Sequence, residues 1–436
     1  MNKEIKIPLV LLGLNTSSYL INYSLNVILA RHLSAHIYGD YSVAIKVLTI
    51  MVELALFGTQ VGTKRFLAKY LDLNRREEAL NYLAWNTKLL SVTFFISIII
   101  ALTTFIIMNY LHYLGIKHIE DYHLAAYTLW LVPFFALVIA LSSLLLLSER
   151  IYFSAMVTDF LNYFLQVFLF FMVIVFVGPT LSNSHIVTVL FTTFMLLILI
   201  AFFLLNKEII NLIKQSIKKA RTISLTKGKW LKTSAGLIVN NIILAVFSAI
   251  DLFIVELFAS SEGAVGHYAA ILVIIGFLWM IPPSVLQPLK RNLATHLDSL
   301  EGRKQLQEKL KTTNKLIISL VLCVGLLIIL FSRQLLNHYG PEYVQAYPAL
   351  IILTIGMMGA CISRIAPVIL VFAGYERLLL QLGLVELILI ILLAIPATYY
   401  FDITGTAVIT SLVFITKAVV IIITIRKKLG IKVWAI

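Results

Sequence analysis

The chain has 436 residues, of which 60% are hydrophobic and only 13% are charged, and its mean hydropathy is +0.97. Soluble domains carry ~25% charged residues, so these values exclude an ordinary soluble protein and predict a chain whose main solvent is lipid. The formal net charge of +14 would suit a nucleic-acid-binding protein, but the basic residues follow the pattern of membrane topology described below, which argues against a nucleic-acid partner.

Apolar runs occupy most of the chain. A helix needs ~20 apolar residues to cross a hydrocarbon core ~30 Å thick. Twelve runs of about this length lie at 8–30, 38–62, 86–109, 121–147, 152–177, 185–205, 233–257, 265–289, 314–331, 345–373, 380–400 and 404–424. They are continuous rather than alternating in polarity, which indicates helices. We therefore predict an all-α integral membrane protein with about 12 transmembrane helices.

The segments between the runs differ in charge. Nearly all Lys and Arg fall in the segments on one side, whereas the segments on the other side hold only Arg31, Lys117 and Arg333. Because cytoplasmic loops carry the basic excess, both termini are expected in the cytoplasm, and the first residues are too short and mild to be a cleaved signal. The chain is thus expected to cross the membrane several times.

The two halves of the chain resemble each other at a constant offset of 227 residues. The offset relates Ser34 to Ser261, Gly39 to Gly266, Tyr41 to Tyr268, Lys64 to Arg291, Lys88 to Lys315, and Glu149-Arg150 to Glu376-Arg377. A fixed offset is the signature of a duplicated unit. We predict an N-terminal six-helix lobe at 1–205, a basic linker at 206–230, and a C-terminal six-helix lobe with a short basic tail at 231–436.

The linker 206–230 holds seven Lys or Arg and has the pattern of an amphipathic helix. Such a helix lies at the membrane surface and binds anionic lipids. Its charges also fix topology, and a site for a cytoplasmic partner is a further alternative.

Several polar residues fall inside the apolar runs. Asn15, Ser18, Asn22 and Asn26 share one face of the first helix, and seven charged residues lie within other helices, namely Lys46, Glu53, Asp159, Asp251, Arg364, Glu386 and Lys417. Charges in hydrocarbon are costly unless they face protein or water, so each is a candidate site residue. For Lys46 and Glu53, the alternative is a simple structural ion pair.

The types of these residues indicate the chemistry of the cavity. Lys46, Arg364 and Lys417, with Arg31 as a less certain fourth cation that can instead extend to the membrane surface, suit an anionic head such as phosphate or diphosphate. The acids suit coupling to a proton or to sodium. No cofactor is predicted beyond such an ion.

Motifs of membrane enzymes are absent from the sequence. There is no HExxH, GxxxxGK[ST] or CxxC motif and no loop long enough for a catalytic domain, so no catalytic residue and no metal site is predicted. The histidines near the expected outer surface lack metal-ligand spacing.

The segment ARHLSAHIYGDYSVA (30–44) resembles the AR-x-L-G-x-x-x-Y-G-x-Y pattern of polysaccharide exporters and Wzx-type O-antigen flippases, and GTQVGTKRFLAKY resembles the end of their second helix. This family belongs to the multidrug/oligosaccharidyl-lipid/polysaccharide (MOP) flippase superfamily. Ser34 departs from the glycine of many members.

The resemblance implies two six-helix lobes in a V-shaped fold like that of MATE transporters, with alternating access. It implies a flippase that moves an undecaprenyl-diphosphate-linked oligosaccharide, a precursor of O-antigen, lipopolysaccharide or another surface polysaccharide, from the inner to the outer leaflet. Polysaccharide polymerase and chain-length machinery would be its protein partners.

Related lipid II flippases have a sodium site made by a helix 7 aspartate and residues of helices 11 and 12. By resemblance, Asp251 and Glu386 occupy such positions, but Lys417 departs from that site, since its ammonium can replace the ion. We expect Lys417 to neutralise Asp251 or Glu386 in one state, which makes transport proton-coupled or uncoupled.

Two other functions were weighed. A cation-coupled drug antiporter of the same superfamily would have an acidic or apolar cavity, and the three buried cations disfavour it. A membrane-embedded glycosyltransferase or polymerase would need a catalytic loop. Finally, Glu149-Arg150 and Glu376-Arg377 lie at equivalent inner turns and are candidates for a cytoplasmic gate or for topology signals alone.

Overall fold

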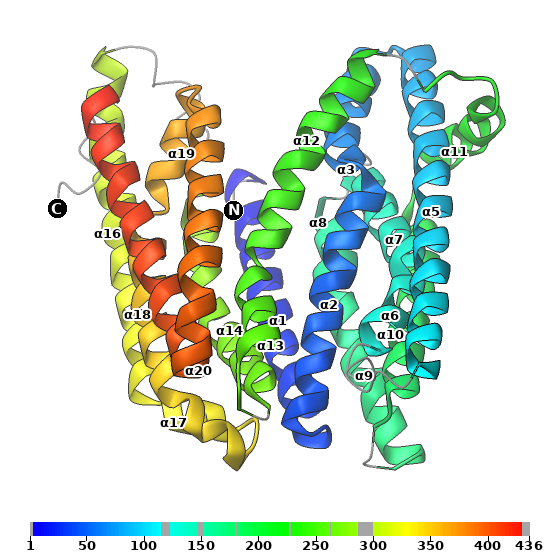
Figure 1. Ribbon diagram of the computed structural model, residues 1–436. Helices are drawn as coiled ribbons and strands as arrows, with labels where there is room; N and C mark the ends of the chain where they lie inside the picture. Colours follow the sequence, from blue (N-terminus) through cyan, green and yellow to red (C-terminus); the bar gives the residue numbers. More distant parts are fainter. Residues whose placement is uncertain are drawn as a thin grey trace. The chain divides into compact units, whose positions relative to one another are not determined.

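The computed structural model describes residues 3–114, 123–146, 151–178, 181–225, 228–261, 263–286 and 300–429. All regular secondary structure in these ranges is helical, as predicted. By packing, the chain forms two compact units (Figure 1). Unit 1 holds residues 1–25 and 40–249, and unit 2 holds residues 26–39 and 250–436.

Unit 1 contains most of the helices from α1 to α12. Its helices are α1 (Lys3–His32, which enters unit 2 at Asn26), α2 (Ala35–Leu56, in unit 1 from Asp40), α3 (Thr59–Gly62), α4 (Ala68–Asp72), α5 (Arg76–Tyr113), α6 (His123–Thr128), α7 (Val132–Leu145), α8 (Ile151–Ala155), α9 (Asn162–Phe176), α10 (Asn183–Leu204), α11 (Lys207–Ala220) and α12 (Gly228–Phe247). Two π-helical turns, Thr63–Leu67 and Met156–Leu161, interrupt the α-helical pattern.

Unit 2 contains the remaining helices. They are α13 (Ile250–Phe258), α14 (Ala264–Trp279), α16 (Leu300–Leu330), α17 (Ser332–Asn337), the 3-10 helix Pro341–Ala346, α18 (Tyr347–Ile362), α19 (Ile365–Phe372) and α20 (Glu376–Leu429). The helix α18 packs against α16, α14 and α20 in this unit.

Nine helices or helix pairs in the described residues are long and apolar enough to cross a membrane, or ten when the bent pair α2 and α3–α4 is included. They account for most of the apolar runs in the sequence. Their exposed apolar side chains, such as Phe95, Phe171 and Leu392, suit contact with lipid, because a helix in a bilayer has no need to bury its apolar surface within the protein. The chain is a multi-pass membrane protein.

The longest helix, α20, turns back on itself at Asp402, whose backbone is not helical (φ 53°, ψ −147°). The two arms, orange and red in Figure 1, are joined across this corner by a 2.7 Å hydrogen bond between the hydroxyls of Thr398 and Thr406. Gly405 is required at the corner, since a Cβ there would lie 2.0 Å from the carbonyl oxygen of Ala397. The corner divides the 54 residues of α20 into the two apolar runs seen in the sequence.

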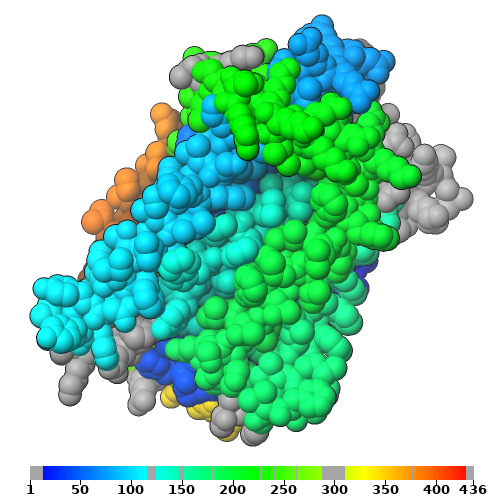
Figure 2. All heavy atoms as spheres, turned by 90° about the vertical axis from the view of Figure 1, so that its right-hand side faces the viewer, coloured from blue at the N-terminus to red at the C-terminus, as the bar shows by residue number. Residues whose placement is uncertain are grey.

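The helix α11 lies against α5 in unit 1, as Figure 2 shows for the green and blue residues at the top of that view. Asn206 caps its first turn by accepting a 2.8 Å bond from the backbone of Ile209. Ile209, Leu212 and Ser216 are buried, and the Ser216 hydroxyl lies 3.3 Å from that of Thr87 on α5. The expected amphipathic helix is therefore present, with its main apolar face covered by protein.

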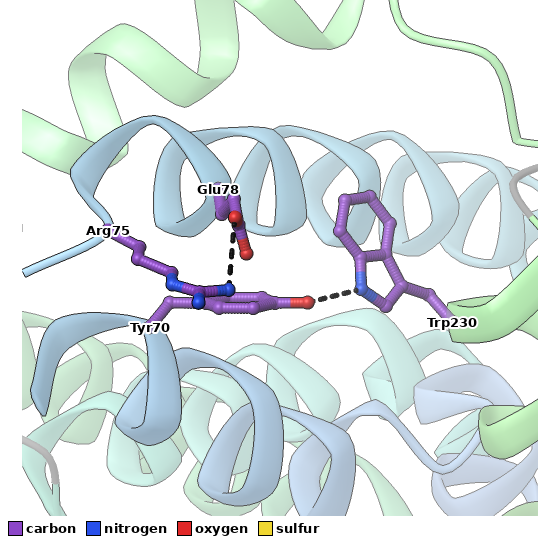
Figure 3. Close-up of polar contacts among 4 residues, drawn as sticks. All are labelled: Tyr70, Arg75, Glu78 and Trp230. Atoms are coloured by element: carbon purple, nitrogen blue, oxygen red, sulfur yellow. Dashed lines mark hydrogen bonds and ion pairs between the residues drawn. The ribbon is translucent and has the colours of Figure 1, made fainter. Parts of the chain in front are cut away.

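Aromatic side chains fix the segment that follows α11. The Trp230 indole donates a 3.1 Å hydrogen bond to the Tyr70 hydroxyl, beside the exposed ion pair of Arg75 and Glu78 (Figure 3). Trp85 packs on Trp230 and donates to the carbonyl of Leu225. These contacts anchor the start of α12 to α4 and to the first half of α5.

Candidate functional site

In unit 2, Arg364 lies at the junction of α18 and α19, where the helix breaks for two residues. Its guanidinium carbon is 4.1 Å from the centre of the Trp279 ring at the end of α14. A planar guanidinium stacks on an indole face through a cation–π interaction, which holds the charge without neutralising it. The sequence predicted Arg364 as a site residue but gave no indication of Trp279.

The two arms of α20 bring Lys417 to Glu386. The Lys417 ammonium donates to the Glu386 carboxylate, which is 3% exposed, whereas the lysine side chain is 31% exposed. Arg364 also interacts electrostatically with Glu386. Lys417 thus contacts the acid directly, Arg364 acts on it electrostatically, and the three side chains together carry one excess positive charge. Glu386 is one of the two acids that the sequence offered as partners of Lys417.

Asp251 lies in the first turn of α13 and is buried. The Tyr268 hydroxyl on α14 donates to its carboxylate at 3.4 Å. Tyr268 is fully buried and was singled out in the sequence only as a repeated position. The pair places a second acid in the interior of unit 2.

Arg31 is exposed at the end of α1, in the part of that helix that belongs to unit 2. Its Nε donates a 2.7 Å bond to the carbonyl of His338. This contact gives Arg31 a structural partner, while its role toward a substrate remains a prediction.

In unit 1, Glu53 on α2 is half-buried and accepts two hydrogen bonds at the same carboxylate oxygen. Gln60 on α3 donates at 2.7 Å and Asn241 on α12 donates at 2.9 Å. The Glu53 carboxylate thus has two amide donors, and the roles of Glu53 and Lys46 remain predictions. Lys46 is half-buried two turns earlier on α2.

Asp159 is exposed within the π-helical turn Met156–Leu161, next to Tyr163, whose neighbours include Tyr19 and Tyr41. π-Helical turns occur frequently at functional sites. The 227-residue offset places Asp159 at the position of Glu386, a correspondence that was available in the sequence. Asn22 is half-buried on α1.

The proposed gate residues are described only in part. Glu149 and Arg150 lie outside the described residues. Glu376 is the first residue of α20, and Arg377 beside it is exposed. A gate at these positions remains a prediction. Within the described residues, no group of three or more His, Cys, Asp or Glu could hold a metal ion.

Comparison with known proteins gave matches in structure alone. No protein-family model matches the chain, and no curated protein matches it in sequence. A multidrug resistance MATE family transporter of the MOP superfamily, solved in an inward-facing conformation, is similar over 98% of this chain and 100% of its own, with a TM-score of 0.73 and 16% identity.

Two other solved structures are similar over most of their length. The lipid II flippase MurJ in an inward closed conformation is matched over 96% of this chain and 87% of its own, with a TM-score of 0.67 and 13% identity. A MOP superfamily transporter from Pyrococcus furiosus, described as having a binding pocket of reverse polarity, is matched over 98% and 95%, with a TM-score of 0.61 and 14% identity. The protein has the fold of MOP-superfamily transporters.

Proposed function

We propose that this protein is a flippase that moves an undecaprenyl-diphosphate-linked oligosaccharide from the inner to the outer leaflet of a bacterial cytoplasmic membrane. The observation that carries the proposal is the group of Arg364, Lys417 and Glu386 in unit 2, because two cations against one acid leave an excess positive charge in the membrane region. A diphosphate needs such charge when it crosses a low-dielectric region. The similar fold of a lipid II flippase supports a lipid-linked substrate.

The proposed architecture has twelve crossings in two six-helix lobes, at 1–205 and 231–436, joined by the basic linker 206–230. Both termini lie in the cytoplasm, and the lobes form a V that alternates in access. The corner of α20 supports this count, since each arm alone is long enough for one crossing. The glycan is O-antigen or another surface polysaccharide, and the polymerase and chain-length machinery act on the translocated product.

Coupling follows from the pairing of Lys417. An ammonium at the Glu386 carboxylate supplies the positive charge that a sodium ion would otherwise bring. We expect transport that does not require sodium. Transport that is stimulated by sodium and loses this stimulation in Asp251→Asn would contradict the expectation.

Deletion in the native host tests the flippase function. Lipids are extracted from the deletion strain and the sidedness of undecaprenyl-linked glycans is determined. We expect glycan intermediates to accumulate on the inner leaflet and the surface polysaccharide to be lost, with recovery on complementation. Their mass identifies the sugar.

The second candidate is a drug antiporter, since MATE family transporters share the fold. It predicts unchanged glycolipids and new sensitivity to cationic dyes in the deletion strain. The cations of unit 2 argue against it, because they repel a cationic drug.

A further inference from the structure

Four buried polar side chains lie in unit 1 where α3 packs on α12 and the π-helical turn after α3 packs on α5. Thr63 begins this turn, and Ser234 lies on α12. Tyr82 and Asn86 lie one turn apart on α5, and Asn86 is the most exposed of the four at 6%. Polar atoms buried this deeply need hydrogen-bond partners, because bulk water does not reach them.

The four side chains satisfy one another only in part. Asn86 Nδ2 donates a 3.2 Å hydrogen bond to Thr63 Oγ1, which also lies 3.5 Å from the Tyr82 hydroxyl. Asn86 Oδ1 and the Ser234 hydroxyl make no hydrogen bond with the described residues. Other helical serines bond to their own helix, as Ser216 does to the carbonyl three residues earlier. The Ser234 hydroxyl therefore needs a partner from outside its helix.

Two glycines bring α3 and its following turn close to these groups. Gly58 has a φ of 70°, and a Cβ there would lie 2.7 Å from the carbonyl oxygen of Ser234, so α3 approaches α12 closely. A Cβ on Gly62 would lie 2.9 Å from the Tyr82 hydroxyl oxygen and 3.6 Å from Ser234 Oγ. Both hydroxyls thus face the same side of Gly62, where the lack of a side chain leaves room for a molecule the size of water.

The Tyr82 hydroxyl is held in this position by the packing of its ring. The ring is fully buried, and its centre lies 5.5 Å from that of Phe66, 6.0 Å from that of Trp85 and 5.5 Å from that of Trp230. Trp230 is itself bonded to Tyr70 (Figure 3). Because the ring cannot turn toward bulk solvent, its hydroxyl must be satisfied inside unit 1.

The unpaired atoms indicate the chemical class of the missing partner. Asn86 Oδ1 can only accept a hydrogen bond, whereas the Ser234 hydroxyl has a proton to donate. A metal cation offers no acceptor for that proton, and an anion offers no donor for the amide oxygen. Water both donates and accepts, and a buried water makes about three hydrogen bonds. Water would also suit the group with the amide of Asn86 turned over, since the atom left unpaired would then be a donor.

We propose that one ordered water molecule binds beside Gly62 and joins α5 to α12. It accepts a hydrogen bond from the Ser234 hydroxyl and donates to Asn86 Oδ1 and to the Tyr82 oxygen. Through Thr63, which accepts from Asn86, the π-helical turn belongs to the same network. The water is a structural part of unit 1, because it completes the hydrogen bonds of side chains from two helices that do not bond to each other directly.

The sign of a stability change tests this water. If Ser234 had no partner, removing its buried hydroxyl would leave the stability unchanged or raise it. With the water bound, Ser234→Ala should instead lower the melting temperature of the purified full-length protein by about 2 °C. Ser97→Ala is the matched control, since Ser97 is also buried but donates to a carbonyl of its own helix, and it should have little effect. An unchanged or higher melting temperature of Ser234→Ala would overturn the proposal.

Hydroxyl-radical footprinting with X-rays detects the water directly, because radicals formed from a bound water oxidise the side chains next to it even when these are buried. We expect oxidation of Tyr82 in the wild type. Tyr38, equally buried and bonded directly to Asn26, should stay unmodified. Gly62→Ala places a methyl group at the site and should abolish the oxidation of Tyr82, whereas Gly383→Ala should not. A wild-type Tyr82 as unreactive as Tyr38 would contradict a bound water.

A bound alkali cation is the competing occupant, and salt exchange separates it from water. The melting temperature of the wild type is compared in sodium, potassium and choline chloride at equal ionic strength. We expect no difference that depends on Ser234. A rise specific to sodium or potassium that Ser234→Ala abolishes would assign the site to a cation instead. These measurements use no substrate, so their outcome does not depend on whether the chain exports a glycan.

Discussion

The cation of Arg364 is held by an aromatic ring, and this distinguishes it from Lys417, which is bound to an acid. A guanidinium stacked on indole keeps its donors directed outward, so Arg364 is the better candidate to bind a diphosphate. The stacking partner then sets the orientation of the charge. It follows that Trp279 should matter although it carries no charge.

Substitution of these two residues separates charge from orientation. Arg364→Ala should abolish glycan export. Arg364→Lys keeps a charge without the planar stacking and should export partially, and Trp279→Leu should lower export about tenfold, the equivalent of ~1.4 kcal/mol of lost cation–π energy. Surface glycan is quantified against the amount of inserted protein. If the two single variants, Arg364→Ala and Lys46→Ala, both export glycan at the wild-type level, the proposal of a cationic cavity is refuted.

The Lys417 and Glu386 pair makes a stability prediction. Removing the lysine leaves a carboxylate that is 3% exposed without its partner, so Lys417→Met should cost about 3 kcal/mol of unfolding free energy. The double variant Lys417→Met with Glu386→Gln should recover most of this loss, because no buried carboxylate is left without its lysine. Denaturant unfolding in detergent measures both. Losses that simply add in the double variant would show that the two residues do not act as a pair.

For individual residues, the sequence predicted which charged side chains lie within membrane helices but not which groups they contact. The sequence indicated Glu53 because its charge lies within an apolar run. The donor from Asn241 depends on the bend at Gly58 and on packing of α12, which no local pattern encodes. Trp279 was overlooked for the same reason, since it lies 85 residues before Arg364 in the chain.

The contact between α2 and α14 depends on two glycines that occupy corresponding positions in the two halves of the sequence. Gly39 and Gly266 are equivalent under the 227-residue offset, and the two helices meet at them within unit 2. A Cβ on Gly39 would lie 2.9 Å from the backbone nitrogen of Gly266, and one on Gly266 would lie 2.0 Å from the carbonyl oxygen of Ala35. The glycines permit backbone contact, a common feature of helix crossings in membranes.

Gly266→Ala should therefore lower the stability by roughly 1–3 kcal/mol, because the backbone of Ala35 cannot yield as a flexible side chain would. Gly383→Ala on α20 is the matched control, since a Cβ there meets nothing within 4 Å. This control should be neutral or slightly stabilising, as alanine favours a helix over glycine. Thermal unfolding in detergent gives the comparison, and equal melting temperatures for the two variants would rule out close packing at position 266.

The helix α11 makes a prediction about lipids. Its buried face packs on α5, while Lys207, Lys214 and Lys218 are exposed along the opposite face, with the exposed Ile217 on one flank. A basic face beside an apolar flank binds anionic headgroups. Phosphatidylglycerol should raise the melting temperature of the wild type in detergent, and replacing these lysines with glutamine should remove most of that rise.

The control carries the same charge change elsewhere, at Lys311, Lys315 and Lys427, all exposed. It should retain the response to phosphatidylglycerol. An equal loss in both triple variants would indicate a general effect of net charge rather than a lipid site on α11.

For the whole molecule, the two halves share helices and differ in charge. Asp159 and Glu386 are equivalent, but the positions that correspond to Lys46, Arg364 and Lys417 in the other half are Val273, Leu137 and Leu190. The predicted duplication thus relates two acids but none of these three cations. The recurring apolar runs and glycines predict the repeat, whereas the division into packed units could not be read from the sequence, since residues 26–39 pack in unit 2.

The proposed topology predicts on which side of the membrane each loop lies, and the side of the corner of α20 is the critical test. If each arm of α20 crosses the membrane, then the corner lies on the outer side and both α11 and the start of α16 lie inside. Single cysteines are introduced into a Cys323→Ser, Cys361→Ser background at exposed positions, with Ser182, Ser260, Gln334 and Tyr400 expected outside and Asn74, Gln215 and Thr312 expected inside.

Intact cells are treated with a membrane-impermeant maleimide before and after lysis. Cysteines of the first group should react in intact cells, and those of the second only after lysis. The Tyr400 site is the sensitive one, because 54 residues of helix at ~1.5 Å each are far too long for one crossing of ~30 Å and must return to the side where they began. The twelve-helix arrangement has an odd number of crossings between Thr312 and Tyr400, so these two positions must lie on opposite sides of the membrane. Labelling of Tyr400→Cys and Thr312→Cys from the same side would contradict it.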